Sequence, residues 1–467
     1  MIHLVKRLTV PGLVGPPHRR TGDRAAYTAT VSADSVAANP AAPEPTAHAA
    51  PRVRFATWLA MGVGIGVVVR VLYTVLAAPW PPHGLDDQGY YHLAPILLAH
   101  GRGFIEPVFA SIGRTVATAE HPPLYPIVLT GLAELGGTGQ LVQRLAGTVF
   151  GAGTIVAIGC LGRRLAGDRA GLLAAGIAAV YPILITADGA LMSETLYGLL
   201  IAVSLLAALR AYETPTLGRA VTLGILLALA ALTRGEAVLL FVLLAVPILR
   251  RSRGGRAAAV ALAALVIVLT PWTVHNLDVF GRLVPISDDT GGVIGGANCD
   301  ATYSPGTFLG SWSYFCNHMT PGNEARQAAH DQSVGIRYAL HHVRRWPAVV
   351  AARIERVWSL RGPFEINSGR APWAQNAGVI MYYVLLGPAQ QGFALLRRRR
   401  RPVWVLVAPA VSVTIAAVLG YGFLRLREPA EITLVVLAAV TIDHVISRRA
   451  GARPPVAGGP RVAAEPA

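Results

Sequence analysis

The chain has 467 residues, of which 53% are hydrophobic and only 14% are charged. Soluble domains carry about 25% charged residues, so this composition excludes an ordinary water-soluble protein and predicts a helical membrane protein. The formal charge is +16, but arginines gathered between apolar runs are a membrane-topology signal rather than a sign of nucleic-acid binding.

About ten apolar runs approach the roughly 20 residues that a membrane-spanning helix needs. They lie near 57–78, 141–161, 170–187, 193–210, 220–233, 236–249, 257–274, 376–396, 402–421 and 429–446. The pattern predicts an all-α polytopic membrane fold with about ten transmembrane helices over residues 51–449. Residues 1–50, which are rich in Ala, Pro, Thr and Ser and lack the apolar stretch of a cleaved signal, and residues 450–467 are predicted to be disordered cytoplasmic tails.

One further run, 122–135, holds about 14 residues and begins with two prolines, which suits a re-entrant or interfacial helix. If this run stays on the outer side, the arginine clusters fall in the cytoplasm, as the positive-inside rule requires. These clusters lie at 163–169, 210–219, 250–256, 397–401 and 448–449. The sequence therefore predicts a multi-pass plasma-membrane protein with both termini inside and two outward segments, 79–140 and 276–375.

The first outward segment carries an acid pair, Asp86 and Asp87, followed by Tyr90 and Tyr91. A carboxylate held near lipid has a raised pKa and can accept a proton from a hydroxyl nucleophile. The alternative is that two acids merely solvate a loop. The apolar stretch PILLAHGRGF that follows is expected to form a helix along the membrane interface.

Further polar residues stand at the outer ends of apolar runs. Glu120 and His121 precede two prolines; a protonated His121 can bind phosphate, although a polar helix start is the alternative. Asp188 and Glu194 flank a short break, and acids within membrane spans are functional candidates by default. Ser193 has a sufficient explanation as a helix cap.

Three arginines, Arg234, Arg425 and Arg427, depart from the cytoplasmic pattern. Phosphate is a good partner for an outward guanidinium group beside apolar helices. The alternatives are outer-leaflet headgroups or pairing with the nearby acids Glu236, Glu428 and Glu431.

Cys299 and Cys316 both fall in the second outward segment, where an oxidising environment favours a disulfide, with free buried thiols as the alternative. The GGVIGG stretch at 291–296 is followed by NCDATY rather than an apolar helix, so it is not a convincing phosphate loop. The histidines show no tight metal-ligand spacing. No metal site is predicted, and a need for a divalent cation is left open.

The order of these motifs resembles a known family. An acid pair with a following tyrosine is succeeded by EHPPLYP, a short acid break, LTRGE, PWTVHNLDVFGRLVPIS and RLREPAE. This order is similar to the GT-C superfamily of integral-membrane glycosyltransferases, and within it to the family 39 and aminoarabinose-transferase-like group, which includes protein O-mannosyltransferases. The resemblance covers about residues 55–446.

The resemblance implies a polyprenyl-phosphate sugar donor and transfer on the non-cytoplasmic face. It implies that Asp86 is the base or acceptor-orienting carboxylate, with Asp87 beside it. The groups that it places at the donor phosphate are Arg234, His121, Tyr90, Arg425 and Arg427, with Glu120 and Glu194 as supporting acids. Gly89 stands where some relatives carry a phosphate-binding arginine, so the donor sugar remains open.

The sequence thus predicts a glycosyltransferase that moves a sugar from a lipid-linked donor to a hydroxyl of a glycan, a glycolipid or a protein. Segment 79–140 is expected to hold the catalytic site and segment 276–375 the acceptor side, and Asp86→Asn is expected to abolish transfer. A transporter or lipid flippase is the alternative, although no internal repeat of the kind common in transporters is visible. A non-catalytic scaffold is a third reading.

Overall fold

The computed structural model describes residues 51–79, 86–251, 255–317, 321–365 and 369–451. The predicted tail 1–50 and residues 452–467 of the predicted tail 450–467 lie outside the described residues, whereas residues 450–451 end helix α18 (Glu428–Gly451). Within these ranges all the regular secondary structure is helical, apart from one isolated β-bridge between Ile105 and Ala117. The predicted all-α class is therefore confirmed for the part of the chain that is described.

Among the described residues, six helices are long and apolar enough to cross a membrane. They are α1 (Pro51–Leu76), α5 (Gln140–Ala166), α8 (Glu194–Glu213), α11 (Arg256–Phe280), α16 (Pro372–Arg398) and α18 (Glu428–Gly451), which continues the 3-10 helix η3 (Leu424–Arg427). Each has at least 20 residues, and at about 1.5 Å per residue it can span a hydrocarbon core of about 30 Å. The protein is a multi-pass membrane protein.

The other predicted spans are bent or short. Helices α6 (Asp168–Val180) and α7 (Pro182–Asp188) meet at an angle of 58° and count as a seventh span if they cross together. The break falls at Pro182, which has no N–H to continue the preceding helix. The remaining runs form the 15-residue helices α9 (Leu217–Ala231) and α10 (Ala237–Arg251) and the 16-residue α17 (Trp404–Leu419). Their lengths of about 22–24 Å fall short of the core, so ten spans remain a prediction.

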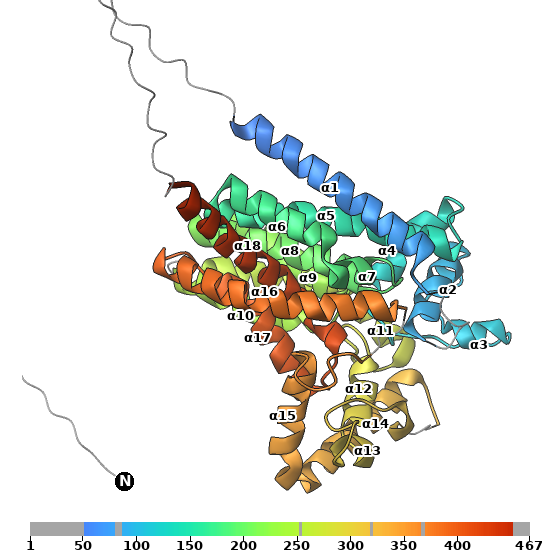
Figure 1. Cartoon of the computed structure of the whole chain (residues 1–467). Helices are drawn as coiled ribbons and strands as arrows, with labels where there is room; N and C mark the ends of the chain where they lie inside the picture. The colour runs from blue at the N-terminus through green and yellow to red at the C-terminus, as the bar shows by residue number, and fades with distance from the viewer. Residues whose placement is uncertain (1–50, 80–85, 252–254, 318–320, 366–368, 452–467) are drawn as a thin grey trace, which may run out of the picture. The chain divides into compact units, whose positions relative to one another are not determined.

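Small residues let the long helices pack closely. Helix α16 packs along α18, α9 along α11, and α1 along α5 and α6 (Figure 1). A side chain at Gly392 on α16 would collide with the backbone of Leu437 on α18, and one at Gly224 on α9 would collide with the backbone of Ala261 on α11. Close approach of this kind is a main source of helix association in lipid.

The first predicted outward segment folds into α2 (Asp87–Ala99), α3 (Pro107–Ser111) and α4 (Leu124–Glu134). Helix α4 corresponds to the ambiguous run 122–135 and has 11 residues, too few for a full span. It packs against α2 and the start of α5. The segment is therefore helical, as expected, and α4 is a short apolar helix beside the membrane-spanning ones.

The second segment contains several short helices. They are α12 (Asp289–Ala297), α13 (Asp300–Tyr303), η1 (Tyr314–Cys316), α14 (Glu324–His341), η2 (Val343–Arg345) and α15 (Trp346–Val357). A disulfide joins Cys299 and Cys316, whose Cα atoms are 6.1 Å apart. The GGVIGG stretch lies in α12, and a side chain at Gly291 would collide with the backbone of α14. Gly291 therefore serves close packing between α12 and α14.

Candidate active site

A cavity of about 1470 Å³ lies where the two predicted outward segments meet. The first segment contributes α2 and residues 106–122 to its wall, and the second contributes α12, α14 and α15. The link between α9 and α10 and the residues that precede α18 complete this wall. The Asp288 N–H donates to the Ala119 carbonyl at 3.1 Å, and the Leu124 N–H donates to the Leu232 carbonyl at 2.9 Å. The volume exceeds the roughly 300–1,000 Å³ of ordinary small-molecule sites, so the cavity has room for more than one substrate.

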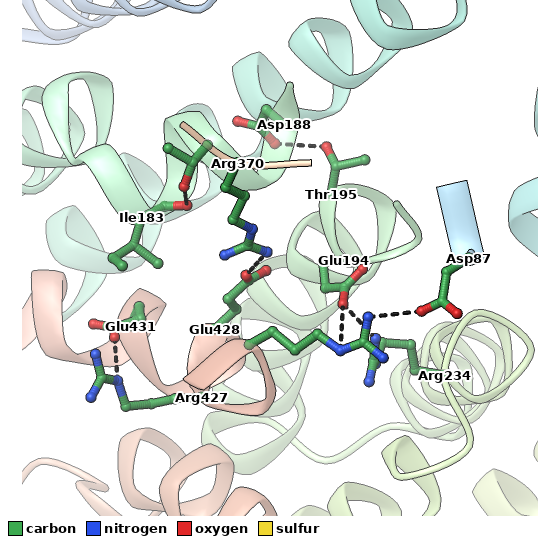
Figure 2. Close-up of polar contacts among 12 residues, drawn as sticks. Asp87, Ile183, Asp188, Glu194, Thr195, Arg234, Arg370, Arg427, Glu428 and Glu431 are labelled. Carbon is green, nitrogen blue, oxygen red and sulfur yellow. Dashed lines mark hydrogen bonds and ion pairs between the residues drawn. The ribbon is translucent and has the colours of Figure 1, made fainter. Parts of the chain in front are cut away.

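Alternating charges gather on one side of this cavity. Arg425 Nη1 lies 2.8 Å from Asp87 Oδ2, and Arg425 Nε lies 3.8 Å from Glu194 Oε1. Arg234 Nη1 lies 2.8 Å from the same Glu194 oxygen, and Arg234 Nε lies 2.6 Å from Glu236 Oε1. Figure 2 shows Asp87, Glu194 and Arg234 in one group. Two guanidinium groups from distant parts of the chain therefore converge on one buried carboxylate.

The structure separates the two acids of the predicted catalytic pair. Asp86 is the N-cap of α2, and its Oδ1 accepts a hydrogen bond from the Gly89 N–H at 3.1 Å. Asp87 lines the cavity and lies 3.9 Å from Nε2 of His121. Burial raises the pKa of Asp87, but the charges of Arg425 and His121 outweigh burial and hold that pKa well below its usual range. Asp87 is therefore ionised at neutral pH.

His121 lies against two tyrosines. Its ring centroid is 4.6 Å from that of Tyr90 and 5.0 Å from that of Tyr91. Tyr91 lines the cavity, whereas the predicted Tyr90 is not among the lining residues. The Tyr90 hydroxyl is buried and has no hydrogen-bond partner within the described residues. Burial raises the pKa of both tyrosines, so both stay neutral.

Another part of the cavity wall is acidic. Its members are Glu106, Glu120, Asp288, Asp289, Glu324 and Asp331. Glu120 opens onto the cavity. The surrounding protein desolvates its carboxyl and raises the pKa of that group to about 7, although the charge of His121 acts in the opposite direction. Burial likewise raises the pKa of Asp289. Glu120 therefore changes its charge near neutral pH.

Asp288 and Glu324 form a carboxyl–carboxylate pair at the junction of the two segments. Glu324 accepts hydrogen bonds from the Ala119 N–H at 2.8 Å and from the Thr118 hydroxyl at 3.1 Å. Burial, together with the charge of Asp288 and a hydrogen bond to it, raises the pKa of Glu324 to about 10. Glu324 is therefore protonated at neutral pH. In the described ranges, no three His, Cys, Asp or Glu side chains are placed to hold a metal ion.

Arg425 and Arg427 have different surroundings, although the sequence analysis assigned both to the donor phosphate. Arg425 lines the cavity. Arg427 is 1% exposed, and its Nε lies 2.5 Å from Glu431 Oε1 (Figure 2). Its Nη1 donates to Ser359 Oγ at 2.7 Å. The geometry gives no support to direct phosphate binding by Arg427, because protein groups enclose its guanidinium.

Asp188, a candidate from the break between apolar runs, is a structural residue rather than part of the cavity wall. Its Oδ2 lies 2.6 Å from Arg70 Nε, and its Oδ1 accepts a hydrogen bond from the Thr195 hydroxyl at 2.6 Å. The other Arg70 nitrogens donate to the carbonyls of Ala178 and Ala179. These contacts hold the bend between α6 and α7.

Sequence reasoning missed several residues in or beside the cavity. Asp288 and Asp289 repeat the adjacent-acid pattern of the first segment immediately after VPIS, and this was an available signal. Glu324 and Arg370 carried none, because each stands alone in a long polar segment. Arg370 is buried and pairs with Glu428, which only the folded chain brings near (Figure 2).

The fold and this cavity define a polytopic helical membrane protein with a large polar cavity between its two loop segments. Residues 120–275 match the family model described as dolichyl-phosphate-mannose-protein mannosyltransferase, which confirms the family resemblance predicted from the motifs. The matched segment contains Glu120, His121, Glu194 and Arg234, whereas Asp87 and Arg425 lie outside it. Among curated proteins, none matches the chain in sequence.

Solved structures of one archaeal enzyme share the fold at low sequence identity. An oligosaccharyltransferase from Archaeoglobus fulgidus tethered with an acceptor peptide matches with a TM-score of 0.52 and 16% identity, over 85% of this chain and 50% of that chain. AglB from the same organism, in complex with an inhibitory peptide and a dolichol-phosphate, matches with a TM-score of 0.50 and 14% identity, over 86% and 52%. ArnT from Cupriavidus metallidurans bound to undecaprenyl phosphate has a TM-score of 0.38 and 15% identity, over 85% and 79%. The chain spans about half the length of the archaeal enzyme.

Proposed function

We propose that this protein is a glycosyltransferase that moves a sugar from a polyprenyl-phosphate donor to a hydroxyl acceptor on the non-cytoplasmic face of the plasma membrane. The observation that carries the proposal is the convergence of Arg234 and Arg425 on Glu194, beside Asp87, at the wall of a large cavity. The family match over 120–275 agrees with it. The archaeal structure of similar fold is a complex with dolichol-phosphate, which belongs to the same chemical class as the proposed polyprenyl-phosphate donor lipid.

In this proposal, Arg234 and Arg425 bind the donor phosphate. A guanidinium group presents a planar fork of N–H donors that fits phosphate oxygens. Glu194 and Glu236 hold the two guanidinium groups in place, so the charge that develops on the departing phosphate meets preorganised cations. His121 adds a further positive charge when it is protonated.

Asp87 is the proposed general base, because its carboxylate lines the cavity beside Arg425, the proposed ligand of the leaving phosphate. The acceptor oxygen forms a bond to the anomeric carbon while the bond from that carbon to the phosphate oxygen breaks. The hydroxyl proton passes to Asp87, and polyprenyl phosphate leaves with the bonding electrons. Asp86 caps α2 and thereby orients Asp87, rather than acting as the base that the family resemblance implied.

The second segment forms the acceptor side in this proposal. Its carboxyl groups on the cavity wall, Asp289 among them, can accept hydrogen bonds from acceptor hydroxyls. A glycan, a glycolipid or a protein hydroxyl fits this description equally. The ten-span count and the cytoplasmic termini belong to the same proposal, because they place the arginine clusters inside.

The test is a transfer assay in proteoliposomes with a panel of radiolabelled polyprenyl-phosphate sugars. Asp87→Asn is expected to lower kcat by about 10²–10⁴-fold, which is the usual contribution of a general base. Asp86→Asn is the matched control and should keep most of the activity, because Asn caps helices about as well as Asp.

An inactive Asp86→Asn variant beside an active Asp87→Asn variant would overturn this assignment and restore the one implied by the family. Movement of a labelled lipid across the bilayer without transfer of any sugar would count against the glycosyltransferase and for a flippase.

A further inference from the structure

A pocket of about 250 Å³ adjoins the large cavity and shares four lining residues with it, Met192, Trp312, Tyr421 and Arg425. Ser311, Arg370 and Phe423 line only this smaller pocket, here called the side pocket. We propose that the side pocket binds the donor sugar, and that it selects a single neutral or acidic sugar over a cationic amino sugar. This inference rests on the proposed function.

The side pocket lies next to the proposed phosphate site, which is where the sugar of the donor must bind. The anomeric carbon is attached directly to a phosphate oxygen, so the sugar must bind next to the phosphate site. Arg425, the proposed phosphate ligand, lines both spaces. A donor held there can place its sugar in the side pocket and leave the large cavity to the acceptor. At about 250 Å³, below the roughly 300–1,000 Å³ of drug-sized sites, the side pocket suits one sugar ring.

The walls of the side pocket combine aromatic faces with a few polar groups. The ring centroids of Trp312 and Tyr421 are 6.4 Å apart, and those of Tyr421 and Phe423 are 6.3 Å apart. These rings form a continuous apolar wall against which the C–H face of a sugar can pack. The hydroxyl of Ser311 can both donate to and accept from a sugar hydroxyl. Apolar walls with few polar groups are typical of small-molecule sites.

The charges of the side pocket decide which sugars fit. Arg370 is buried: its Nη2 pairs with Glu428, while its Nη1 has no hydrogen-bond partner within the described residues. A buried donor without an acceptor is costly. A sugar hydroxyl or carboxylate oxygen can accept from it, whereas an ammonium group has only donors. No carboxylate of the described chain lines this pocket, so an ammonium group placed there would find no anionic acceptor in its wall.

The first experiment compares two ligands of the purified protein in detergent: polyprenyl phosphate and polyprenyl-phosphate glucose, galactose or mannose. Phe423→Ala and Ser311→Leu should weaken binding of the sugar-bearing lipid at least 10-fold and leave binding of polyprenyl phosphate unchanged. Phe308→Ala is the matched control, since Phe308 lies in the same segment as Ser311, is 60% exposed and lines neither the side pocket nor the large cavity. It should change neither affinity.

Equal loss for both lipids, or no loss for either, would overturn the side pocket as the sugar site while the wild-type protein still binds polyprenyl phosphate. A wild-type protein that neither binds polyprenyl phosphate nor transfers any sugar would overturn the proposed function itself, and this inference with it.

The second experiment uses pairs of donors that differ by one ammonium group. Each of the three hexose donors is compared with its 2-amino-2-deoxy counterpart, and the amino sugar should bind at least 10-fold more weakly in every pair that binds. An amino-sugar donor that binds as tightly as its hexose counterpart, or more tightly, would overturn the selection by charge.

Discussion

Neighbouring groups set the protonation states of individual carboxyl groups in this protein. Asp87 stays ionised because two cations face it, whereas Glu324 keeps its proton because it is buried against Asp288. The pKa of Glu324 is raised from 4.5 to about 10, so the folded chain holds this proton more tightly than the unfolded chain. Its contribution to stability is therefore complete below about pH 4.5 and is lost progressively as the pH rises toward 10.

Glu324→Gln should remove this pH dependence. The amide oxygen can still accept from the Ala119 N–H, and the amide N–H₂ can donate to Asp288 without needing a bound proton. We expect the variant to be more stable than the wild type by several kcal/mol at pH 8–9, since each pH unit between the two pKa values contributes about 1.4 kcal/mol, and nearly equal to it near pH 5. Thermal unfolding in detergent across this pH range measures the effect.

The exposed Glu134 on α4 provides the control for this prediction. Glu134→Gln should leave the stability–pH curve unchanged. A Glu324→Gln curve with the same slope as the wild-type curve would show that the Asp288–Glu324 pair does not govern the pH response.

Helix ends and breaks, rather than helix interiors, position the site. Helix α2 begins at Asp87 because Asp86 caps it, and this turns only the second acid toward the cavity. Helix α8 begins at Glu194, which brings its carboxylate to the two arginines. The break before α8 is held by Arg70 and Asp188 in the interior of the helix bundle. Disruption of this pair should therefore affect both stability and the placement of Glu194.

Arg70→Leu should destabilise the protein by about 3–5 kcal/mol, because it leaves Asp188 as an unpaired buried charge. The double variant Arg70→Leu/Asp188→Asn removes that charge and keeps an acceptor for the Thr195 hydroxyl, so it should recover much of the loss. The unfolding temperature and the monodisperse yield in detergent measure both effects. A single variant as stable as the wild type would mean that the pair does not hold the break.

The molecule as a whole brings two loop segments, 79–140 and 276–375, into direct contact. The hydrogen bonds from the Asp288 N–H to Ala119 and from the Ala119 N–H to Glu324 require both segments to lie on the same side of the bilayer. The arginine cluster 397–401 follows the far end of α16, which begins directly after the second segment. The positive-inside rule therefore predicts that this cluster is cytoplasmic and that the cavity opens on the outer face.

Cysteine labelling checks this sidedness. In a Cys160→Ser background that keeps the disulfide, Ser333→Cys on α14 should react with a membrane-impermeant maleimide in intact cells. Arg399→Cys should react only after the cells are permeabilised. Both positions are exposed, so burial does not limit the reaction. The reverse pattern would place the cavity on the cytoplasmic face and would contradict the proposed donor side.

The sequence by itself determined the membrane class, the helical fold, the two loop segments and most of the polar candidates. Run length, hydropathy and arginine placement are local properties, and they can be read without knowing which helices meet. Glu120, His121, Glu194, Arg234 and Arg425 were all named from such local signals, and the structure brings all five to the cavity or to the charge cluster at its wall.

Only the tertiary structure decided which of two similar neighbours faces the cavity. Asp86 and Asp87 differ by one position and Arg425 and Arg427 by two, yet one member of each pair lines the cavity while the other caps a helix or is enclosed by protein. Whether short helices such as α9 and α17 complete a span, and how Asp288, Glu324 and Arg370 join the site, also depends on packing. The physical reason is that side-chain direction and charge pairing arise from contacts between segments far apart in the chain, which hydropathy and spacing do not encode.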